Sequence, residues 1–324
     1  MNVRIRRALI VAVVIPLLFA ALSTTVKAES DKPIIVCTTS AVGSVVQEFL
    51  GDSADVVVLV QPGLCPADFD MKPSDIYAVS NAEILFKQNI PGEFWLQELL
   101  NAAGNTNLVQ VAIPGDYGTP EGAKRYISWV GGNLSQILVL NLDAKISAML
   151  ADVDEVSSWM ASRAQALQAS SVKVICMKWL KPFVEAAGYQ VVATYNPPET
   201  LSAGDITTLV NTAQSEGVAL IVDNLQIDVE FGKGIAAQVG AEHVVLTNFP
   251  GAIPGTGNLT QMFQYNAEQL FNATSTWRTT AALRVDMEGL RNHLTIFQIT
   301  TSVAVIVAVV EAVWLYVGRK RRWP

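Results

Sequence analysis

The sequence predicts an α/β fold in which two Rossmann-like lobes are joined by one long helix. Short apolar runs alternate with helical patterns from Asp31 to about Asn272, which is typical of parallel sheets with crossover helices. Residues 143–169 have helical periodicity without glycine or proline, and they separate two such series. Apolar segments at both ends of the chain add an N-terminal signal peptide and a C-terminal transmembrane helix to this plan.

The first segment, residues 1–28, has the composition of a secretion signal. Arg4, Arg6 and Arg7 form a basic start, Ala8–Leu22 is a short apolar run, and small residues flank Lys27 before the expected cleavage point. The alternative is an uncleaved N-terminal anchor, which the short apolar run disfavours.

The first lobe is expected over residues 31–142. Its most informative stretch is Gln61–Phe86, where a polar loop with Cys65, Asp68 and Asp70 follows an apolar strand and precedes a helix. Ligands bind at the carboxyl ends of strands in such folds, so we expect binding there. Residues 114–132 are expected to form loops that face a cleft. The expected strands are Pro33–Cys37, Asp55–Val60, Ala82–Phe86 and Asn107–Ile113, and the expected helices are Val42–Leu50, one that begins at Ser74, and Phe94–Ala103.

A linking helix over residues 143–170 leads to a second lobe over residues 171–273. The same alternation of apolar runs and helical patterns predicts a second parallel sheet. The expected strands are Val172–Met177, Tyr189–Tyr195, Ala219–Val222 and His243–Leu246, and the expected helices are Leu180–Ala187, Asp205–Glu216, Glu230–Val239 and Leu259–Phe271.

The C-terminal region divides into a polar stalk (residues 274–293), a transmembrane helix (residues 294–317) and a basic tail (residues 318–324). The apolar stretch is long enough to cross a bilayer of about 30 Å. Four basic residues, 319–322, follow it, and the positive-inside bias places them in the cytoplasm. The chain is therefore expected to be a single-pass cell-membrane protein with its body on the extracellular side.

Charge and motifs exclude several classes of function. Outside the signal and the tail, 14 basic residues stand against 29 acidic ones, a net charge near −15. This disfavours nucleic acid and anionic membrane surfaces as partners, although it also suits a merely solubilising surface. The sequence has no Gly-x-Ser-x-Gly, His-Glu-x-x-His or glycine-rich phosphate loop, so we expect no enzyme.

Several motifs occur in an order that identifies a family. The body resembles the metal-type solute-binding receptors of ABC transporters, the TroA-like group that delivers zinc or manganese. The resemblance spans roughly Pro33–Ala273. The matching residues are Val36–Ser40 with Val42-Gly43, Pro73-Ser74-Asp75 with Ser80–Phe86, Ala144-Lys145-Ile146, Pro197-Pro198 with Ser202 and Gly204-Asp205-Ile206, Val222–Gln226, and Pro254-Gly255-Thr256 with Met262 and Tyr265-Asn266.

The resemblance implies a receptor that captures a ligand between its lobes and passes it to an ABC permease with its ATPase. It also implies a metal site of three histidines and one carboxylate. The two histidines of this sequence, His243 and His293, do not lie at any of the implied ligand positions. The implied positions fall instead on Ala67 or Asp68, on Gln136, on Met177, and on Thr247 or Asn248.

Loss of imidazole ligands disfavours zinc and manganese, whereas thiolates and thioethers favour a soft ion such as Cu(I). One hypothesis is therefore a soft transition-metal site made by Cys65, Cys176 and Met177, with Asp68 as a harder ligand. The alternative is that Cys37, Cys176 and Met177 simply pack in the core, as free cysteine and methionine most often do.

A second hypothesis is an organic or metal-complex ligand, corrinoid- or siderophore-like, bound by neutral amides and aromatic rings. The cleft residues would be Trp129, Gln136, Asp223, Asn224 and Asn248, with Tyr117 nearby. A third is a domain that serves adhesion or sensing on the same fold. Glu311 lies within the apolar span, where a carboxylate usually faces a partner, or it tilts toward the interface.

Overall fold

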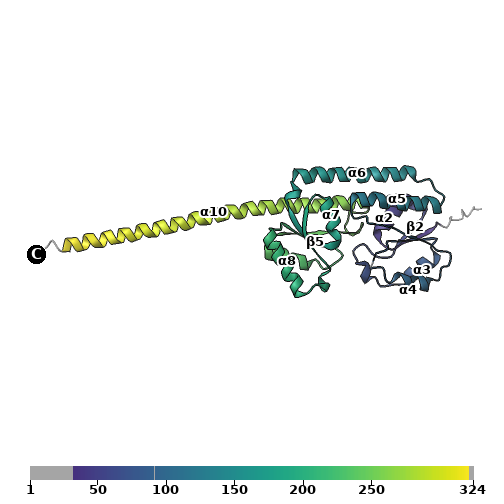
Figure 1. Ribbon diagram of the computed structural model, residues 1–324, viewed down its shortest axis with the longest axis horizontal. Helices are drawn as coiled ribbons and strands as arrows, with labels where there is room; N and C mark the ends of the chain where they lie inside the picture. The colour runs from purple at the N-terminus through teal and green to yellow at the C-terminus, as the bar shows by residue number, and fades with distance from the viewer. Residues whose placement is uncertain (1–31, 91, 321–324) are drawn as a thin grey trace, which may run out of the picture. The chain divides into compact units, whose positions relative to one another are not determined.

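Two four-stranded parallel sheets form the centre of the protein. The computed structural model describes residues 32–90 and 92–320 (Figure 1). The strand orders are β2-β1-β3-β4 and β6-β5-β7-β8, and every pair within them is parallel. The expected α/β class with two parallel sheets is thus confirmed. The expected signal segment lies outside the described residues.

In the first lobe, helices cover both faces of the sheet. α2 packs on β1 and β2 from one face, and α3 packs on β1 from the other, beside α4. Val36 and Leu85 point into the cluster under α3, whereas Ile35 and Phe86 point into the main core. The elements are β1 (Ile34–Cys37), α2 (Ser40–Leu50), β2 (Asp55–Val58), η2 (Pro66–Asp68), α3 (Pro73–Asn81), β3 (Ile84–Lys87), α4 (Leu96–Ala103), β4 (Val109–Ala112) and α5 (Pro120–Ile137).

The second lobe repeats this plan. Its central strand, β5, is buried from Val174 to Met177, because it pairs on both sides and is covered by helices. Ser202 begins α8 with a reciprocal cap to Asp205. The elements are β5 (Lys173–Met177), η4 (Lys178–Leu180), α7 (Lys181–Ala186), β6 (Gln190–Tyr195), η5 (Pro198–Thr200), α8 (Ala203–Glu216), β7 (Leu220–Asn224), α9 (Glu230–Val239) and β8 (Glu242–Leu246).

Two helices contact both lobes. The long helix α6 (Asp143–Ala166) packs on α5 and on α10, and α10 (Leu259–Lys320) packs on β8 and on α2. The amide of Asn258, just before α10, donates to Glu48 of α2 at 3.1 Å. The lobes are therefore joined along their sides by more than the single linking helix that the sequence predicted.

The helix α5 corrects one prediction. Residues 114–132 were expected to be loops because they hold five glycines and two prolines. Instead, Thr119 caps a helix whose first residue is Pro120, a position where proline costs no hydrogen bond. Gly131 permits close packing, since a methyl group there would lie 2.7 Å from both Phe49 and Ile146.

The C-terminal helix is longer than the sequence predicted. The helix expected to end at Phe271 continues without a break through the stalk and the apolar stretch to Lys320. Every residue from Ala282 to Val317 is exposed. An 18-residue window in this helix has a mean hydropathy of 2.1 and no buried residue, so the helix is long and apolar enough to cross a membrane.

Candidate functional site

The loops at the carboxyl ends of the two sheets meet directly. Gln226, two residues after β7, donates its side-chain amide to the carbonyl oxygen of Pro62 in the loop after β2, at 2.9 Å. The same amide contacts the hydroxyl of Thr247 at 2.9 Å, and its oxygen accepts from the backbone of Asn248 at 3.2 Å. Gln226 is buried and therefore holds three loops from two lobes together.

A second contact crosses the lobes beside Gln226. The hydroxyl of Tyr117, in the loop after β4, donates to the carbonyl oxygen of Asn248 at 2.9 Å. Tyr117 is almost fully buried, and this burial raises the pKa of its phenol far above the ordinary value. Tyr117 therefore remains a neutral hydrogen-bond donor at any physiological pH.

The first-lobe wall behind Tyr117 is polar and buried. The hydroxyl of Thr38 accepts from the backbone of Gln88 at 2.9 Å, and the Gln88 side chain accepts from the Tyr126 hydroxyl. Glu93 is 8% exposed; its Oε2 accepts from the backbone of Asn89 at 2.7 Å. Its Oε1 has no hydrogen-bond partner among the described residues, and burial raises the pKa of this carboxyl group.

The expected ligands in the loop after β2 differ in burial. Cys65 is buried at the start of η2, whereas Ala67 and Asp68 are exposed. Burial raises the pKa of the Cys65 thiol, and the negative charges of Asp68 and Glu199 raise this pKa further. Hydrogen bonds from the backbone N–H groups of Ala67 and Asp68 lower it in part. Cys65 is three residues from Pro62, whose carbonyl oxygen accepts from Gln226 of the second lobe, so it lies near the contact between the lobes.

The expected ligands Cys65, Asp68 and Cys176 do not gather into a metal-binding group. Among residues 32–90 and 92–320, no three His, Cys, Asp or Glu side chains come close enough to hold an ion. Cys176 and Met177 are at most 1% exposed within β5, and burial raises the pKa of the Cys176 thiol to about 12. A thiol held neutral in this way is a poor ligand, so Cys176 fits the alternative of a core residue.

Trp129 and Gln136 do not reach the interlobe edge. Both lie on α5, whose Gly131 packs against Phe49 at the far end of α2. Because α2 starts at the carboxyl end of β1 and rises about 1.5 Å per residue, Phe49 is more than 10 Å from that edge. Trp129 and Gln136 are both exposed.

Asp223 also belongs to the interior of the second lobe. Its carboxylate contacts the ring of His243 at 2.6 Å and the hydroxyl of Tyr195, and it would collide with a methyl group at Gly232 of α9. Asn224 is buried in the turn that leads to Gln226, whose backbone it binds. Of the expected cleft residues, Asn248 and Tyr117 are therefore the two that meet across the lobes.

Sequence reasoning missed Gln226, Gln88 and Glu93 as site residues. Each follows a strand closely, at the edge where parallel sheets bind ligands. These residues could therefore have been predicted from the sequence as amide and carboxyl side chains that follow a buried strand.

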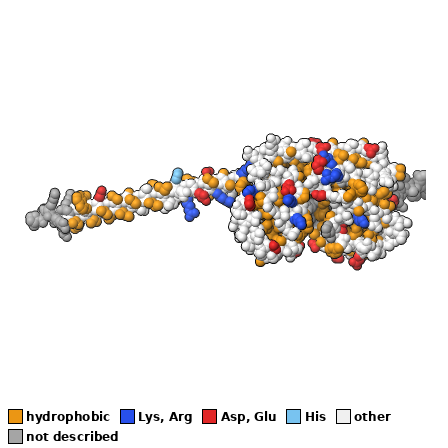
Figure 2. Space-filling view, viewed as in Figure 1, with side chains coloured by type: hydrophobic (Ala, Val, Ile, Leu, Met, Phe, Trp, Pro, Cys, Tyr) orange, Lys and Arg blue, Asp and Glu red, His pale blue; other side chains and the backbone are white. Residues whose placement is uncertain are grey.

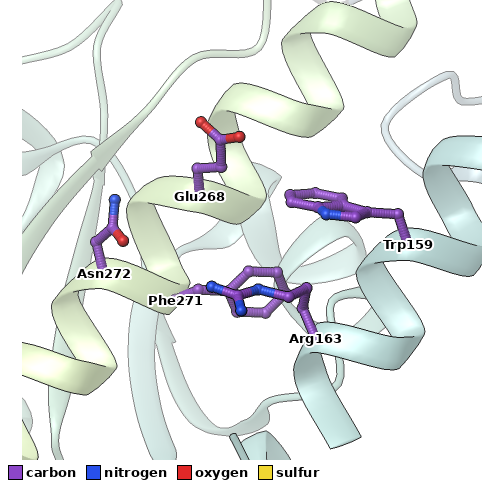
Figure 3. Close-up of a pocket in the computed structure, with 5 residues that line it drawn as sticks. All are labelled: Trp159, Arg163, Glu268, Phe271 and Asn272. Carbon is purple, nitrogen blue, oxygen red and sulfur yellow. The ribbon is translucent and has the colours of Figure 1, made fainter. Parts of the chain in front are cut away.

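Two cavities lie elsewhere, in a groove between α6 and α10. One of about 370 Å³ is lined by Trp159 and Arg163 of α6 and by Glu268, Phe271 and Asn272 of α10 (Figure 3). The other, of about 300 Å³, shares Trp159 and continues toward Thr260. Both lie on the helical side of the molecule and not at the carboxyl ends of the strands.

Comparison with known proteins agrees with this architecture. The family model described as "ZnuA: Zinc-uptake complex component A periplasmic" matches residues 35–273, which include both sheets and the interlobe loops. The chain belongs to this family. The resemblance to TroA-like receptors is thereby confirmed, and the relatives of the chain are substrate-binding transport proteins rather than enzymes.

The relatives of this zinc-uptake component family are distant in sequence. The manganese-binding lipoprotein MntA of Halalkalibacterium halodurans is 23% identical over 269 residues, 74% of this chain and 88% of that protein. The iron ABC transporter substrate-binding lipoprotein MtsA of Streptococcus pyogenes is 33% identical, but over 95 residues only, 28% of this chain and 31% of MtsA.

Solved structures show the same fold. A crystal structure of ZnuA has a TM-score of 0.62 at 21% identity, over 75% of this chain and all of that one. The periplasmic zinc-binding protein TroA from Treponema pallidum has a TM-score of 0.63 at 16% identity, over 75% of this chain and 99% of TroA.

Proposed function

We propose that this protein is the membrane-tethered receptor of an ABC uptake system of the metal-transport type. It captures its cargo between the two lobes and passes it to a permease that an ATPase drives. The observation that carries this proposal is the meeting of both sheets' carboxyl-end loops at Gln226 and Tyr117, inside the segment that the family model matches.

The tether is the second half of the proposal. Residues 294–317 would span the membrane, and the basic residues after them would lie in the cytoplasm. A cleaved or retained N-terminal signal would leave the lobes on the extracellular side. The exposed surface of α10 beyond Ala282 supports this arrangement, because it leaves the apolar stretch free to enter a bilayer.

The cargo we propose is a metal ion presented in a complex rather than a bare zinc or manganese ion. The side chains that meet between the lobes are a phenol and an amide, Tyr117 and Gln226, and both are neutral. Neutral donors and acceptors suit an organic shell around a metal, whereas bare divalent ions need carboxylate or imidazole ligands.

A soft ion is the second candidate, and Cys65 is the observation that favours it. Cys65 is three residues from the interlobe contact at Pro62. Burial raises the pKa of its thiol, and the backbone N–H groups of Ala67 and Asp68 oppose this only in part. Met177 ends β5 at the corresponding edge of the second lobe. These two residues, without Cys176, would bind Cu(I) through sulfur.

The test is elemental analysis and native mass spectrometry of the reduced full-length protein, before and after addition of Zn²⁺, Mn²⁺ or Cu⁺. A bound organic mass with its metal supports the proposed complex. One equivalent of copper, lost in Cys65→Ser but kept in Cys176→Ala, supports the soft ion instead. Tight binding of bare Zn²⁺ or Mn²⁺ would overturn the assignment of the cargo. A protein that takes up none of these and carries no ligand when purified would overturn the receptor itself.

A further inference from the structure

The exposed part of α10 carries an apolar line with the spacing of a coiled coil. Five apolar residues recur at alternating intervals of four and three, and each is between 57% and 70% exposed. They are Leu283, Met287, Leu290, Leu294 and Phe297. We name these five residues the stalk seam. Residues at this spacing form one stripe on a helix, and such a stripe is normally buried against another helix.

The charges beside the stalk seam are arranged for a second copy of the same helix. If Leu283 and Leu290 occupy d positions, Asp286 is at a g position and Arg291 at the following e position. In a parallel two-stranded coiled coil, a g residue of one helix faces the next e residue of its partner. Asp286 of one copy would therefore face Arg291 of the other, and symmetry creates this opposite-charge pair twice.

The same seam continues into the apolar stretch, where its chemistry changes. The next positions at this spacing are Thr301, Ala304, Ala308 and Glu311, all small or polar. On the side of the helix that points away from them, two of the three lines carry only Ile and Val, at positions 296, 303, 310 and 317 and at positions 299, 306 and 313, and the third carries Thr295, Ser302, Val309 and Tyr316. Small residues at one face and branched apolar ones at the other are what a helix pair in lipid requires.

We propose that the protein forms a parallel homodimer through α10, along a seam from Leu283 to Glu311. The second copy is the partner because a common anchor keeps both helices parallel and at the same depth, which places Asp286 opposite Arg291. Confinement to one membrane also raises the effective concentration of a short seam that would be weak in solution. The space-filling view shows hydrophobic side chains uncovered along this helix, beyond its charged first part (Figure 2).

The body leaves the seam free. The residues by which α10 contacts the lobes include Phe263, Leu270 and Trp277, and the last contact is that of Arg284 with the carbonyl oxygen of Gly240 at 3.2 Å. These four residues recur at every seventh position. They therefore form a line along the helix that differs from the line formed by the stalk seam. Both faces can therefore be occupied at once.

Disulfide trapping tests the proposal with the full-length protein in lipid nanodiscs or vesicles at low protein-to-lipid ratio. The native cysteines Cys37, Cys65 and Cys176 are buried, so an introduced cysteine dominates oxidation. Leu290→Cys is expected to give a disulfide-linked dimer, whereas Asn292→Cys, on the opposite side of the helix, stays monomeric. Equal trapping of both variants, no trapping of either, or a trimer in a chemical cross-linking ladder would overturn the seam.

Exchanging the charges at positions 286 and 291 distinguishes a specific dimer from nonspecific association. Asp286→Arg is expected to weaken the dimer about tenfold, since two attractive pairs become repulsive. The double variant Asp286→Arg/Arg291→Asp is expected to restore it, because each pair is then reversed. Failure of the double variant to recover, while its lobes still unfold at the wild-type temperature, contradicts the proposal. Cargo binding is measured separately, so its absence would not affect this result.

Discussion

At the scale of single residues, the most constrained group is Asp223 with its partners Tyr195 and His243. The carboxylate is almost completely buried, and Tyr195 of β6 and His243 of β8 supply its hydrogen bonds. A buried carboxylate is tolerated only when it is paired in this way. The three residues therefore fix the packing of β6, β7 and β8 under α9 and do not form a binding site.

Replacing Asp223 with alanine should therefore lower the free energy of unfolding by about 3 kcal/mol, because it removes the partner of the His243 ring and leaves the Tyr195 hydroxyl only the carbonyl oxygen of Val222. Chemical denaturation of the two proteins measures this change. The matched control is Asp70→Ala, since Asp70 is exposed and should have almost no effect. Similar losses in both variants would argue against a buried network.

The raised pKa of Glu93 should make the free energy of unfolding depend on pH. Its folded-state pKa is raised by burial, so the folded protein holds this proton more tightly than the unfolded chain. The contribution to stability is present at low pH and is lost as pH rises from the ordinary carboxyl value to the raised one. Glu93→Gln should remove this loss.

Unfolding curves of wild type and Glu93→Gln between pH 4 and pH 8, a range set by the carboxyl value of about 4.3 and its raised counterpart, measure the difference. The gain of the variant over wild type should grow with pH. Burial also raises the pKa of Glu48, but Glu48 is present in both proteins and cancels. A constant difference across this range would contradict the prediction.

At the scale of elements, α5 shows how two adjacent glycines can differ. A methyl group at Gly131 would press against Phe49 and Ile146, whereas one at Gly132 would meet no atom within 4 Å. Gly131→Ala should therefore destabilise the protein by about 2 kcal/mol through overpacking. Gly132→Ala should stabilise it by about 0.5–1 kcal/mol, since alanine favours an exposed helix interior. Thermal unfolding of both variants checks the opposite signs.

The sequence predicted the elements with strong periodicity well. The expected helix Glu230–Val239 has the observed bounds of α9, and each expected strand overlaps an observed one. Helix α5 was missed because it is rich in glycine, and the packing role of Gly131 is decided by Phe49 and Ile146 from distant parts of the chain. Sequence alone does not show those neighbours.

The candidate site was predicted less completely, for a related reason. Asn248 was assigned to the interlobe edge, and it lies there, because it directly follows a strand. Gln136 was assigned by counting residues back from α6, but α5 carries the chain away from the edge over that interval. Gln226 and Glu93 were missed because their roles depend on contacts with Pro62 and Asn89.

At the scale of the whole molecule, the expected anchor makes a simple prediction about location. A chain that ends after Ala282 keeps every residue of α10 that is buried in the lobes and loses the apolar stretch. It should move from the membrane fraction to the soluble fraction of the host, with an unchanged unfolding temperature. Cell fractionation and calorimetry measure the two properties. A truncated chain that stays with the membrane would show that another segment anchors the body.

The unbroken course of α10 has a mechanical consequence. Because the helix runs from the core of the second lobe into the apolar stretch, a turn of the lobes about the helix axis also turns the proposed membrane segment. The exposed stalk from Ala282 to His293 has 12 residues and is about 18 Å long. Each residue inserted there would rotate the capture face by about 100° around the helix axis. In the proposed receptor, the length of this one helix therefore sets the direction in which the lobes face relative to the membrane segment.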